Sequence, residues 1–169
     1  MTIKPDDAVS HGTFAIERRY DAAPARVWNA YADPDAYRRW FVEGEGFTIH
    51  EWTHDFRLDG HSHGRFRYGG AENDTYFNHT RYLDLEPGRR IVTAYVMGRE
   101  TLDGPERFSA SLATTEIFAD GTGARLVYTE QGAFFGDRRA DGPVIRQQGC
   151  EQLLDALGGE LAGSDRTDG

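Results

Sequence analysis

The feature that most constrains the fold is a run of strand-like segments that no helical segment interrupts. We predict strands near residues 46–52, 64–68, 77–85, 90–97, 107–118 and 124–131. Turn sequences such as Glu86-Pro87-Gly88 and Asp120-Gly121 separate neighbouring segments at hairpin length. Successive hairpins of this kind build an antiparallel meander.

The two ends of the chain frame this meander differently. A first strand is predicted over 13–20, and two short helices follow it, one starting near Pro24 and one ending near Phe41. At the other end, helical spacing predicts one long helix over 144–161, with a stripe formed mostly by Ile145, Cys150, Leu153, Leu154, Leu157 and Leu161. We therefore expect an α+β fold in which a curved antiparallel sheet of six or seven strands grips this helix.

The length of 169 residues suits one domain. We assign residues 12–162 to that domain, residues 1–11 to a flexible N-terminus and residues 163–169 to a frayed tail. No internal repeat or linker divides the chain.

The charge balance limits the partners. The formal net charge is -9 at pH 7, and an acidic surface repels nucleic-acid phosphates and anionic membrane surfaces. No apolar run approaches the roughly 20 residues of a membrane helix, and residues 1–10 lack the pattern of a signal peptide. We therefore expect a cytoplasmic protein that neither binds nucleic acid nor inserts into a membrane.

Several short segments carry a family resemblance when they are taken in order. They are Ala22-Ala23-Pro24-Ala25-Arg26-Val27-Trp28, Arg39-Trp40-Phe41, Gly64-Arg65-Phe66-Arg67-Tyr68, Leu85-Glu86-Pro87-Gly88, Thr129-Glu130-Gln131-Gly132 and Gly149-Cys150-Glu151-Gln152-Leu153-Leu154. The chain resembles the family related to the activator of the heat-shock-protein-90 ATPase, within the SRPBCC superfamily. This resemblance implies the helix-grip (START-like) fold. His61-Ser62-His63 departs from the plain Gly-Gly of similar sequences.

The function expected from this fold is binding of a small hydrophobic or aromatic molecule, lipid-like or polyketide-like, in a cavity between the sheet and the C-terminal helix. No cofactor is expected, and a homodimer stays open. One alternative is a cyclase, dehydratase or hydrolase that uses the same cavity, although the chain lacks a Gly-x-Ser-x-Gly elbow, a phosphate loop and a dinucleotide motif. The other is a co-chaperone-like interaction module.

Glu130 is the main catalytic candidate, with Tyr128 or His79 as further acid/base groups. By strand alternation Tyr128 and Glu130 share a face, so an inward face would bring Glu130 to the cavity. The alternatives are a structural ion pair with an arginine such as Arg67 and exposure of Glu130 at the end of the strand. The predicted ligand-binding residues are Trp40, Phe41, Arg67, Tyr95, Phe108, Leu112, Tyr128, Glu130, Phe134, Cys150 and Leu154.

One strand leaves its inward face undecided at the sequence level. Phe108, Ala110, Leu112, Thr114 and Glu116 alternate with the small residues Ser109, Ser111, Ala113 and Thr115. If the small residues face inward, they leave volume for a ligand, and otherwise they form a solvent-facing row.

Two further side-chain types have competing interpretations. His61 and His63 could share one strand face and bind a metal with Asp55 or Asp59, or they could lie in an exposed loop. The chain has one cysteine, Cys150. We expect a buried thiol there rather than a nucleophile, because no base lies near it in sequence.

Overall fold

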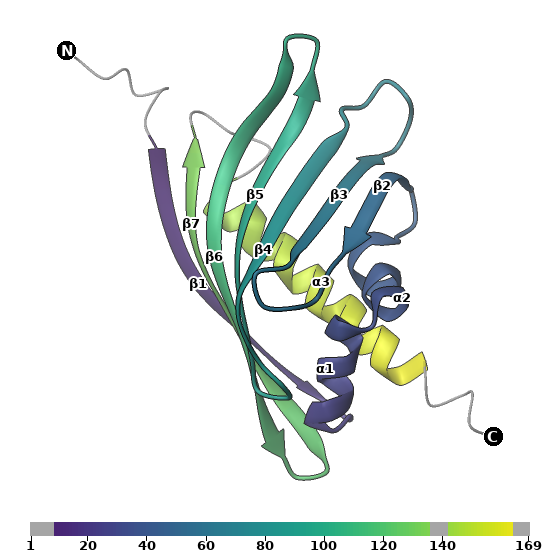
Figure 1. The fold of residues 1–169 in the computed structure, drawn as a ribbon, viewed down its shortest axis with the longest axis vertical. Coiled ribbons are helices and arrows are strands. Elements are labelled where there is room, and N and C mark those ends of the chain that lie inside the picture. Colours follow the sequence, from purple (N-terminus) through teal and green to yellow (C-terminus); the bar gives the residue numbers. More distant parts are fainter. Residues whose placement is uncertain (1–8, 136–141, 164–169) are drawn as a thin grey trace.

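The computed structural model describes residues 9–135 and 142–163. Its core is one seven-stranded sheet with the order β1-β7-β6-β5-β4-β3-β2, in which every neighbouring pair is antiparallel. The strands are β1 (Val9–Tyr20), β2 (Phe47–His54), β3 (His61–Tyr68), β4 (Tyr76–Glu86), β5 (Arg90–Thr101), β6 (Gly104–Asp120) and β7 (Gly123–Phe135). The predicted meander is therefore present as β2–β7, and β1 joins its β7 edge (Figure 1).

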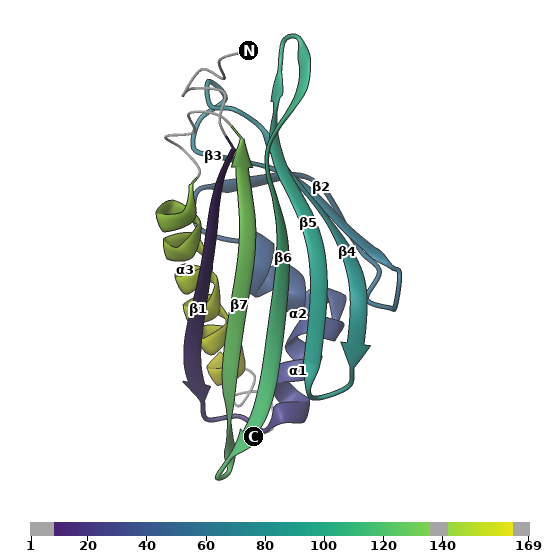
Figure 2. The same cartoon turned by 90° about the vertical axis from the view of Figure 1, so that its left-hand side faces the viewer.

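The helices lie on one face of this curved sheet, as the side view in Figure 2 shows. They are α1 (Pro24–Ala32), α2 (Pro34–Tyr37), the π-helical turn η2 (Arg38–Val42) and α3 (Pro143–Gly163). Asp33 separates the first two because its carboxylate accepts hydrogen bonds from the Asp35 and Ala36 amides, both at 2.9 Å. The helix-grip fold predicted from the sequence is confirmed.

Several strands extend beyond their predicted bounds, and the earlier starts of β3 and β1 correct two predictions. The segment from His61, expected to be an exposed loop, is already strand, because His61 lies opposite Arg81 on β4. The turn before it is fixed by the Asp59 amide, which donates to the Tyr82 carbonyl at 2.9 Å. β1 begins at Val9, inside the predicted flexible N-terminus, because it pairs with β7 from there onward. Residues 1–8 and 164–169 of the two predicted ends lie outside the described residues.

The inward face of β6, which the sequence left undecided, carries the small residues. Ser109, Ser111, Ala113 and Thr115 are all buried, whereas Leu112 is 38% exposed on the opposite face. A bulge places Phe108 inside as well: Ser109 lies opposite Met97 and Arg107 opposite Gly98, so Phe108 is the extra residue. We call the helix-covered side the concave face and the other side the outer face.

The apolar stripe of α3 is shifted by one residue from the prediction at its start. Ile145 is 45% exposed, and the buried positions are Arg146, Cys150, Leu154, Leu157 and Leu161. These residues lie three or four apart, as one face of an α-helix requires. The helix therefore brings a charged side chain to the sheet at its first turn.

Candidate functional site

A charged cluster fills the space between the sheet and the first turns of α3. Its centre is the ion pair between Glu130 on β7 and Arg146 on α3, whose Oε1 and Nη1 atoms are 3.0 Å apart. Glu130 is completely buried and Arg146 is 7% exposed. The other members are Tyr95, Ser109, Ser111, Tyr128 and Cys150.

Every oxygen of the Glu130 carboxylate has a donor. Arg146 and the Tyr95 hydroxyl, at 2.7 Å, donate to Oε1. The Tyr128 hydroxyl donates to Oε2 at 2.6 Å, and the Cys150 thiol approaches the same oxygen at 3.5 Å. A buried carboxylate with this many donors is fully compensated, so its arrangement is that of a structural anchor.

The Arg146 guanidinium also has several hydrogen-bond partners. It donates to the Tyr95 hydroxyl at 2.7 Å and to the Ser109 hydroxyl at 2.6 Å, and Ser111 lies at 3.4 Å. Its charge also lies 5.3 Å from the ring centroid of Phe134. The inward Ser109 and Ser111 therefore serve as acceptors for Arg146 rather than as the walls of an empty cavity.

Burial also suppresses the acidity of the cluster's hydroxyl and thiol groups. It raises the pKa of Tyr95 and of Tyr128 well above the usual range of tyrosine. Burial, followed by the Glu130 charge, raises the pKa of the Cys150 thiol to about 12. A thiol in that state is a poor nucleophile, which agrees with the expected inert Cys150.

A second polar group, the histidine cluster, lies between β2, β3, β4 and α1. The His54 Nε2–H donates to the Tyr31 carbonyl at 2.8 Å, which leaves Nδ1 to accept from Ser62 at 2.7 Å. Ser62 also lies 2.9 Å from the Tyr82 hydroxyl. Burial lowers the pKa of His54 and raises that of Tyr82 to about 12. The cluster is therefore neutral, in contrast to the charged cluster.

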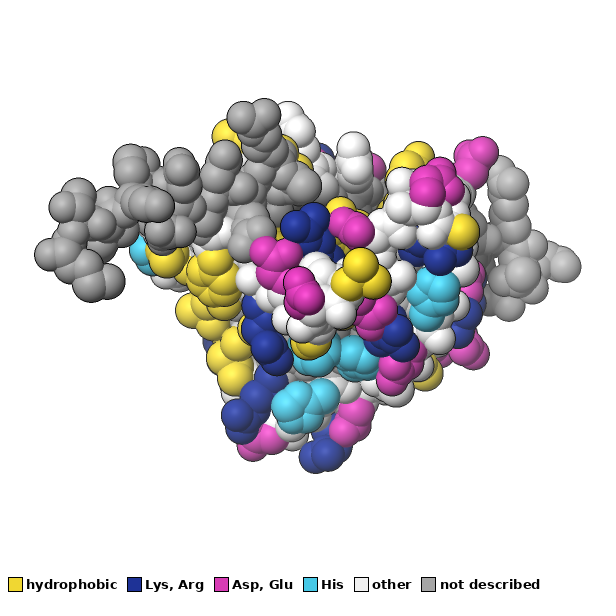
Figure 3. Space-filling view, turned by 90° about the horizontal axis from the view of Figure 1, so that it is seen from above, with side chains coloured by type: hydrophobic (Ala, Val, Ile, Leu, Met, Phe, Trp, Pro, Cys, Tyr) yellow, Lys and Arg dark blue, Asp and Glu magenta, His cyan; other side chains and the backbone are white. Residues whose placement is uncertain are grey.

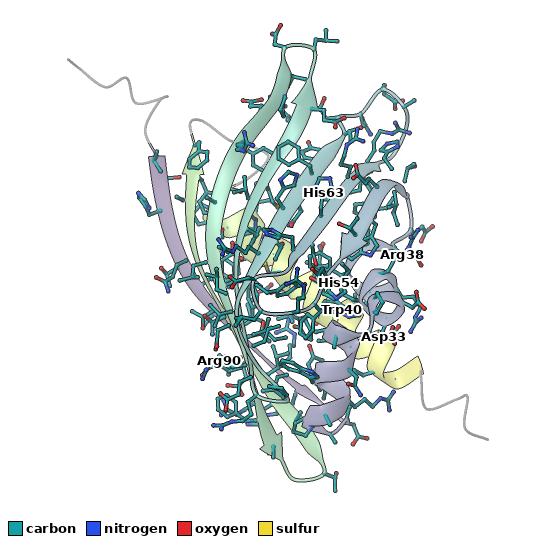
Figure 4. The ribbon with its side chains drawn as sticks, viewed as in Figure 1. Asp33, Arg38, Trp40, His54, His63 and Arg90 are labelled. Carbon is teal, nitrogen blue, oxygen red and sulfur yellow. The ribbon has the colours of Figure 1, made fainter. Side chains whose placement is uncertain are left out.

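Aromatic rings pack around this histidine. Tyr37 stacks on His54 at 4.4 Å and on Phe41 at 4.6 Å between ring centroids. Trp40 is buried beside them and donates its indole N–H to the Ala30 carbonyl at 2.8 Å. Figure 4 shows His54 and Trp40 close to α2, whereas His63 lies farther along the sheet. Both clusters and this packing form what we call the closed half of the concave face.

Beyond the closed half, the concave face carries an aromatic wall that the helices leave partly uncovered. Tyr68 is 60% exposed and Phe47 is 43% exposed. Their ring centroids are 5.1 Å apart, and Phe47 also meets Phe66 edge-on at 6.1 Å. We call this region the open half; the members of its wall are Phe47, Trp52, Phe66, Tyr68 and Tyr76.

Two surface hollows of the described residues lie away from the charged cluster. One has a volume of about 430 Å³ and is lined by Tyr68, Glu72, Asn73, Asp74 and Tyr76, at the edge of the open half. The other, about 160 Å³, lies at the C-terminal end of α3 beside Tyr20. At Glu130 the described side chains contact one another beneath α3, and neither of these hollows is lined by a member of the charged cluster.

The outer face carries the histidines that the sequence singled out as metal candidates. His61 and His63 do share this face, and His63 lies directly opposite His79, with ring centroids 4.2 Å apart. Figure 3 shows histidine, arginine and acidic side chains gathered together, and Glu51 lies 3.5 Å from His63 Nε2. Within residues 9–135 and 142–163, no group of three or more potential ligands is placed to hold a metal ion.

The predicted site residues divide between these regions. Tyr95, Tyr128, Glu130, Phe134 and Cys150 come together in or against the charged cluster. Leu154 and Trp40 are core residues, whereas Phe41 is half-buried against the core and Phe108 packs edge-on against Tyr76. Leu112, His79 and, by strand alternation, Arg67 lie on the outer face. The ion pair of Glu130 with an arginine is confirmed, but the partner is Arg146 of α3 and not Arg67.

Arg146 and the histidine cluster were not identified from the sequence. Arg146 lies about one helical turn before Cys150 and therefore on the same face of α3. A charged residue on this otherwise apolar face was the signal in the sequence that a buried ion pair forms here. The histidine cluster joins residues that are 8, 20 and 28 positions apart on separate strands. Only the alternation of Trp52 and His54 on one strand pointed to an inward histidine.

Membrane crossing by a helix is not supported. Among the residues that the structure describes, no helix combines the length and apolar character that a crossing requires.

Comparison with known proteins agrees with this architecture. The family described as Activator of Hsp90 ATPase homolog 1-like protein matches residues 21–162. A solved protein of Rhizobium loti is 43% identical with a TM-score of 0.80, and the match covers 91% of this chain and 99% of that one. A protein of Rhizobium leguminosarum is 32% identical with a TM-score of 0.80, covering 92% and 97%.

A more distant structure shows the fold alone. The AHSA1-like protein of Aeromonas hydrophila is 15% identical with a TM-score of 0.64, and the match covers 94% of this chain and 97% of that one. No curated protein matches the sequence. On the family match and the two Rhizobium structures together, the chain belongs to the family of Activator of Hsp90 ATPase homolog 1-like proteins.

Proposed function

We propose that this protein binds a small hydrophobic or aromatic molecule on the open half of its concave face. The observation that carries the proposal is the aromatic wall, in which Tyr68 is 60% and Phe47 43% exposed on the side of the sheet that the helices otherwise cover. In the free protein these clustered rings are exposed to water. A ligand that covers them removes apolar surface from water, which favours binding.

The size of the adjoining hollow supports a small ligand. Its volume of about 430 Å³ falls within the range of roughly 300–1,000 Å³ that small-molecule pockets occupy. Tyr68 and Tyr76 line both the hollow and the wall. The ligand would therefore lie across the ends of β3 and β4 and extend over the rings.

Glu130 was considered above both as a ligand-binding and as a catalytic residue. Its contacts in the charged cluster argue against catalysis. Glu130 is completely buried and accepts from three donors, two tyrosines and Arg146. A general acid or base must reach the substrate's proton. The contacts of Glu130 hold α3 to the sheet. The aromatic wall lies in a different region, the open half of the concave face.

The proposal is tested with the neutral fluorescent probe N-phenyl-1-naphthylamine. Phe47→Ser should weaken binding about tenfold, which corresponds to about 1.4 kcal/mol of lost apolar contact. Phe118→Ser is the matched control, because Phe118 is 39% exposed but lies on β6 outside the wall. Equal effects of the two variants on probe binding would contradict the proposal. If Phe47→Ser alone weakens probe binding, mass spectrometry of molecules released from the gently purified protein would identify the natural ligand class.

A further inference from the structure

Asn78 is the polar side chain that the fold places at the inner edge of the aromatic wall. On β4 it lies opposite Gly64 of β3 on one side and Met97 of β5 on the other. It is half-buried and shares the concave face with Thr80 and Tyr82, two and four residues further along the strand. It therefore stands at the boundary between the open and the closed half.

Of the two polar groups of the Asn78 amide, the oxygen has a partner and the nitrogen does not, within the described part of the chain. The Thr80 hydroxyl donates to its Oδ1 at 2.7 Å, which turns Nδ2 away from Thr80. Within the described part of the chain Nδ2 has no acceptor. Because Asn78 is only half-buried, its Nδ2 can be reached from the open half, and a ligand oxygen placed there can accept its hydrogen bond.

The neighbours of Asn78 favour a flat ligand. Gly64 has no side chain, and the Trp52 ring lies over it, 3.3 Å from where a Cβ would stand. The register thus places an indole on one side of Gly64 and the Asn78 amide on the other. Aromatic rings stack or meet edge-on with other rings, so a planar aromatic body suits this floor.

The charges around the hollow favour a neutral ligand. Glu72 and Asp74 line it. Arg99 pairs with Asp74 at 3.2 Å, but it also pairs with Glu106 at 2.8 Å. The net charge of the chain is -9. An anionic ligand would therefore meet repulsion at the entrance.

From these observations we infer that the open half takes a neutral, planar aromatic molecule with a hydrogen-bond-accepting oxygen, and that Asn78 Nδ2 donates to this oxygen. The inference rests on the proposed function and adds the ligand's chemical class. Asn78 is thereby a specificity residue, because it distinguishes ligands that have the oxygen from those that lack it.

The test compares two probes of similar size, 2-acetonaphthone and 2-ethylnaphthalene, by quenching of tryptophan fluorescence. The ratio of their dissociation constants is measured for the wild type and for Asn78→Leu, so that differences in probe solvation cancel. We expect this ratio to move roughly three- to tenfold against the ketone in the variant. Asn78→Asp, which replaces the donor by an acceptor, should move it further. The anion 2-naphthoate should bind more weakly than the ketone.

The control is Gln131→Leu, which removes an exposed amide on the outer face and should leave the ratio unchanged. Thermal unfolding by circular dichroism checks that each variant is folded. An unchanged ratio in both Asn78 variants, or tighter binding of 2-naphthoate than of the ketone, would overturn the inference. If Phe47→Ser still weakens both neutral probes, the proposed function survives that result; if it weakens neither, the proposed function fails.

Discussion

The two halves of the concave face use the same strands in opposite ways. In the closed half, α1, η2 and α3 cover the sheet, and the buried polar groups Glu130, Arg146 and Ser62 have partners within the protein. In the open half, aromatic rings remain exposed, and Asn78 Nδ2 has no acceptor among the residues that the structure describes. One surface thus separates two roles: the closed half stabilises the fold, and the open half is available for recognition. Substitutions in the closed half should therefore affect folding, and those in the open half should affect binding.

The largest effect is expected from Glu130→Gln. It leaves the Arg146 charge buried without its counter-ion, which should cost about 3–5 kcal/mol of unfolding free energy, measured by urea denaturation. Glu51→Gln removes a half-exposed carboxylate on the outer face and should cost less than about 1 kcal/mol. The double variant Glu130→Gln, Arg146→Met should be less destabilised than Glu130→Gln alone. A Glu130 variant as stable as the Glu51 variant would refute the anchoring role.

Ser62→Ala tests the neutral cluster against the charged one. It removes the hydroxyl that His54 Nδ1 accepts from, and should destabilise the protein by about 1–3 kcal/mol in the same assay. A loss as large as that of Glu130→Gln would show that burial, and not charge, decides the cost.

Acid should weaken the closed half through His54. Burial lowers the pKa of this ring, so the fold favours the neutral form. The stabilising contribution is present above the pKa of an unfolded histidine, about 6.5, and is lost as the pH falls through the lower folded pKa. The wild type should therefore lose more stability between pH 7 and pH 5 than His54→Gln, whereas His61→Gln on the outer face should follow the wild type. Parallel curves for the wild type and His54→Gln would contradict this.

The smallest effect on stability is expected in the open half. Phe47→Ser should lower the unfolding free energy by only about 1 kcal/mol, because the ring is already 43% exposed. Its thermal unfolding should match that of Phe118→Ser even though its probe binding does not. A marked loss of stability would mean that the wall is part of the core.

The order of the elements followed from the sequence because its signals are local. Alternation and turn residues marked the strands between 46 and 131, and helical spacing marked α3. The same local reasoning placed Tyr128 and Glu130 on one face, as they are. It misplaced Leu112, because alternation gives two sets of residues and does not say which one the helix covers. It also could not show that Phe108 is the bulge residue that turns inward.

What the sequence determined by itself was therefore the helix-grip architecture and the family, since periodicity and segment order are properties of the chain. Which residues meet, by contrast, depended on how the elements pack in three dimensions. Arg146 rather than Arg67 neutralises Glu130, because the start of α3 brings Arg146 Nη1 to 3.0 Å from Glu130 Oε1. The closed half is filled and the open half is not for the same reason: burial depends on where the helices lie across the sheet, and contacts between distant elements leave no local trace in the sequence.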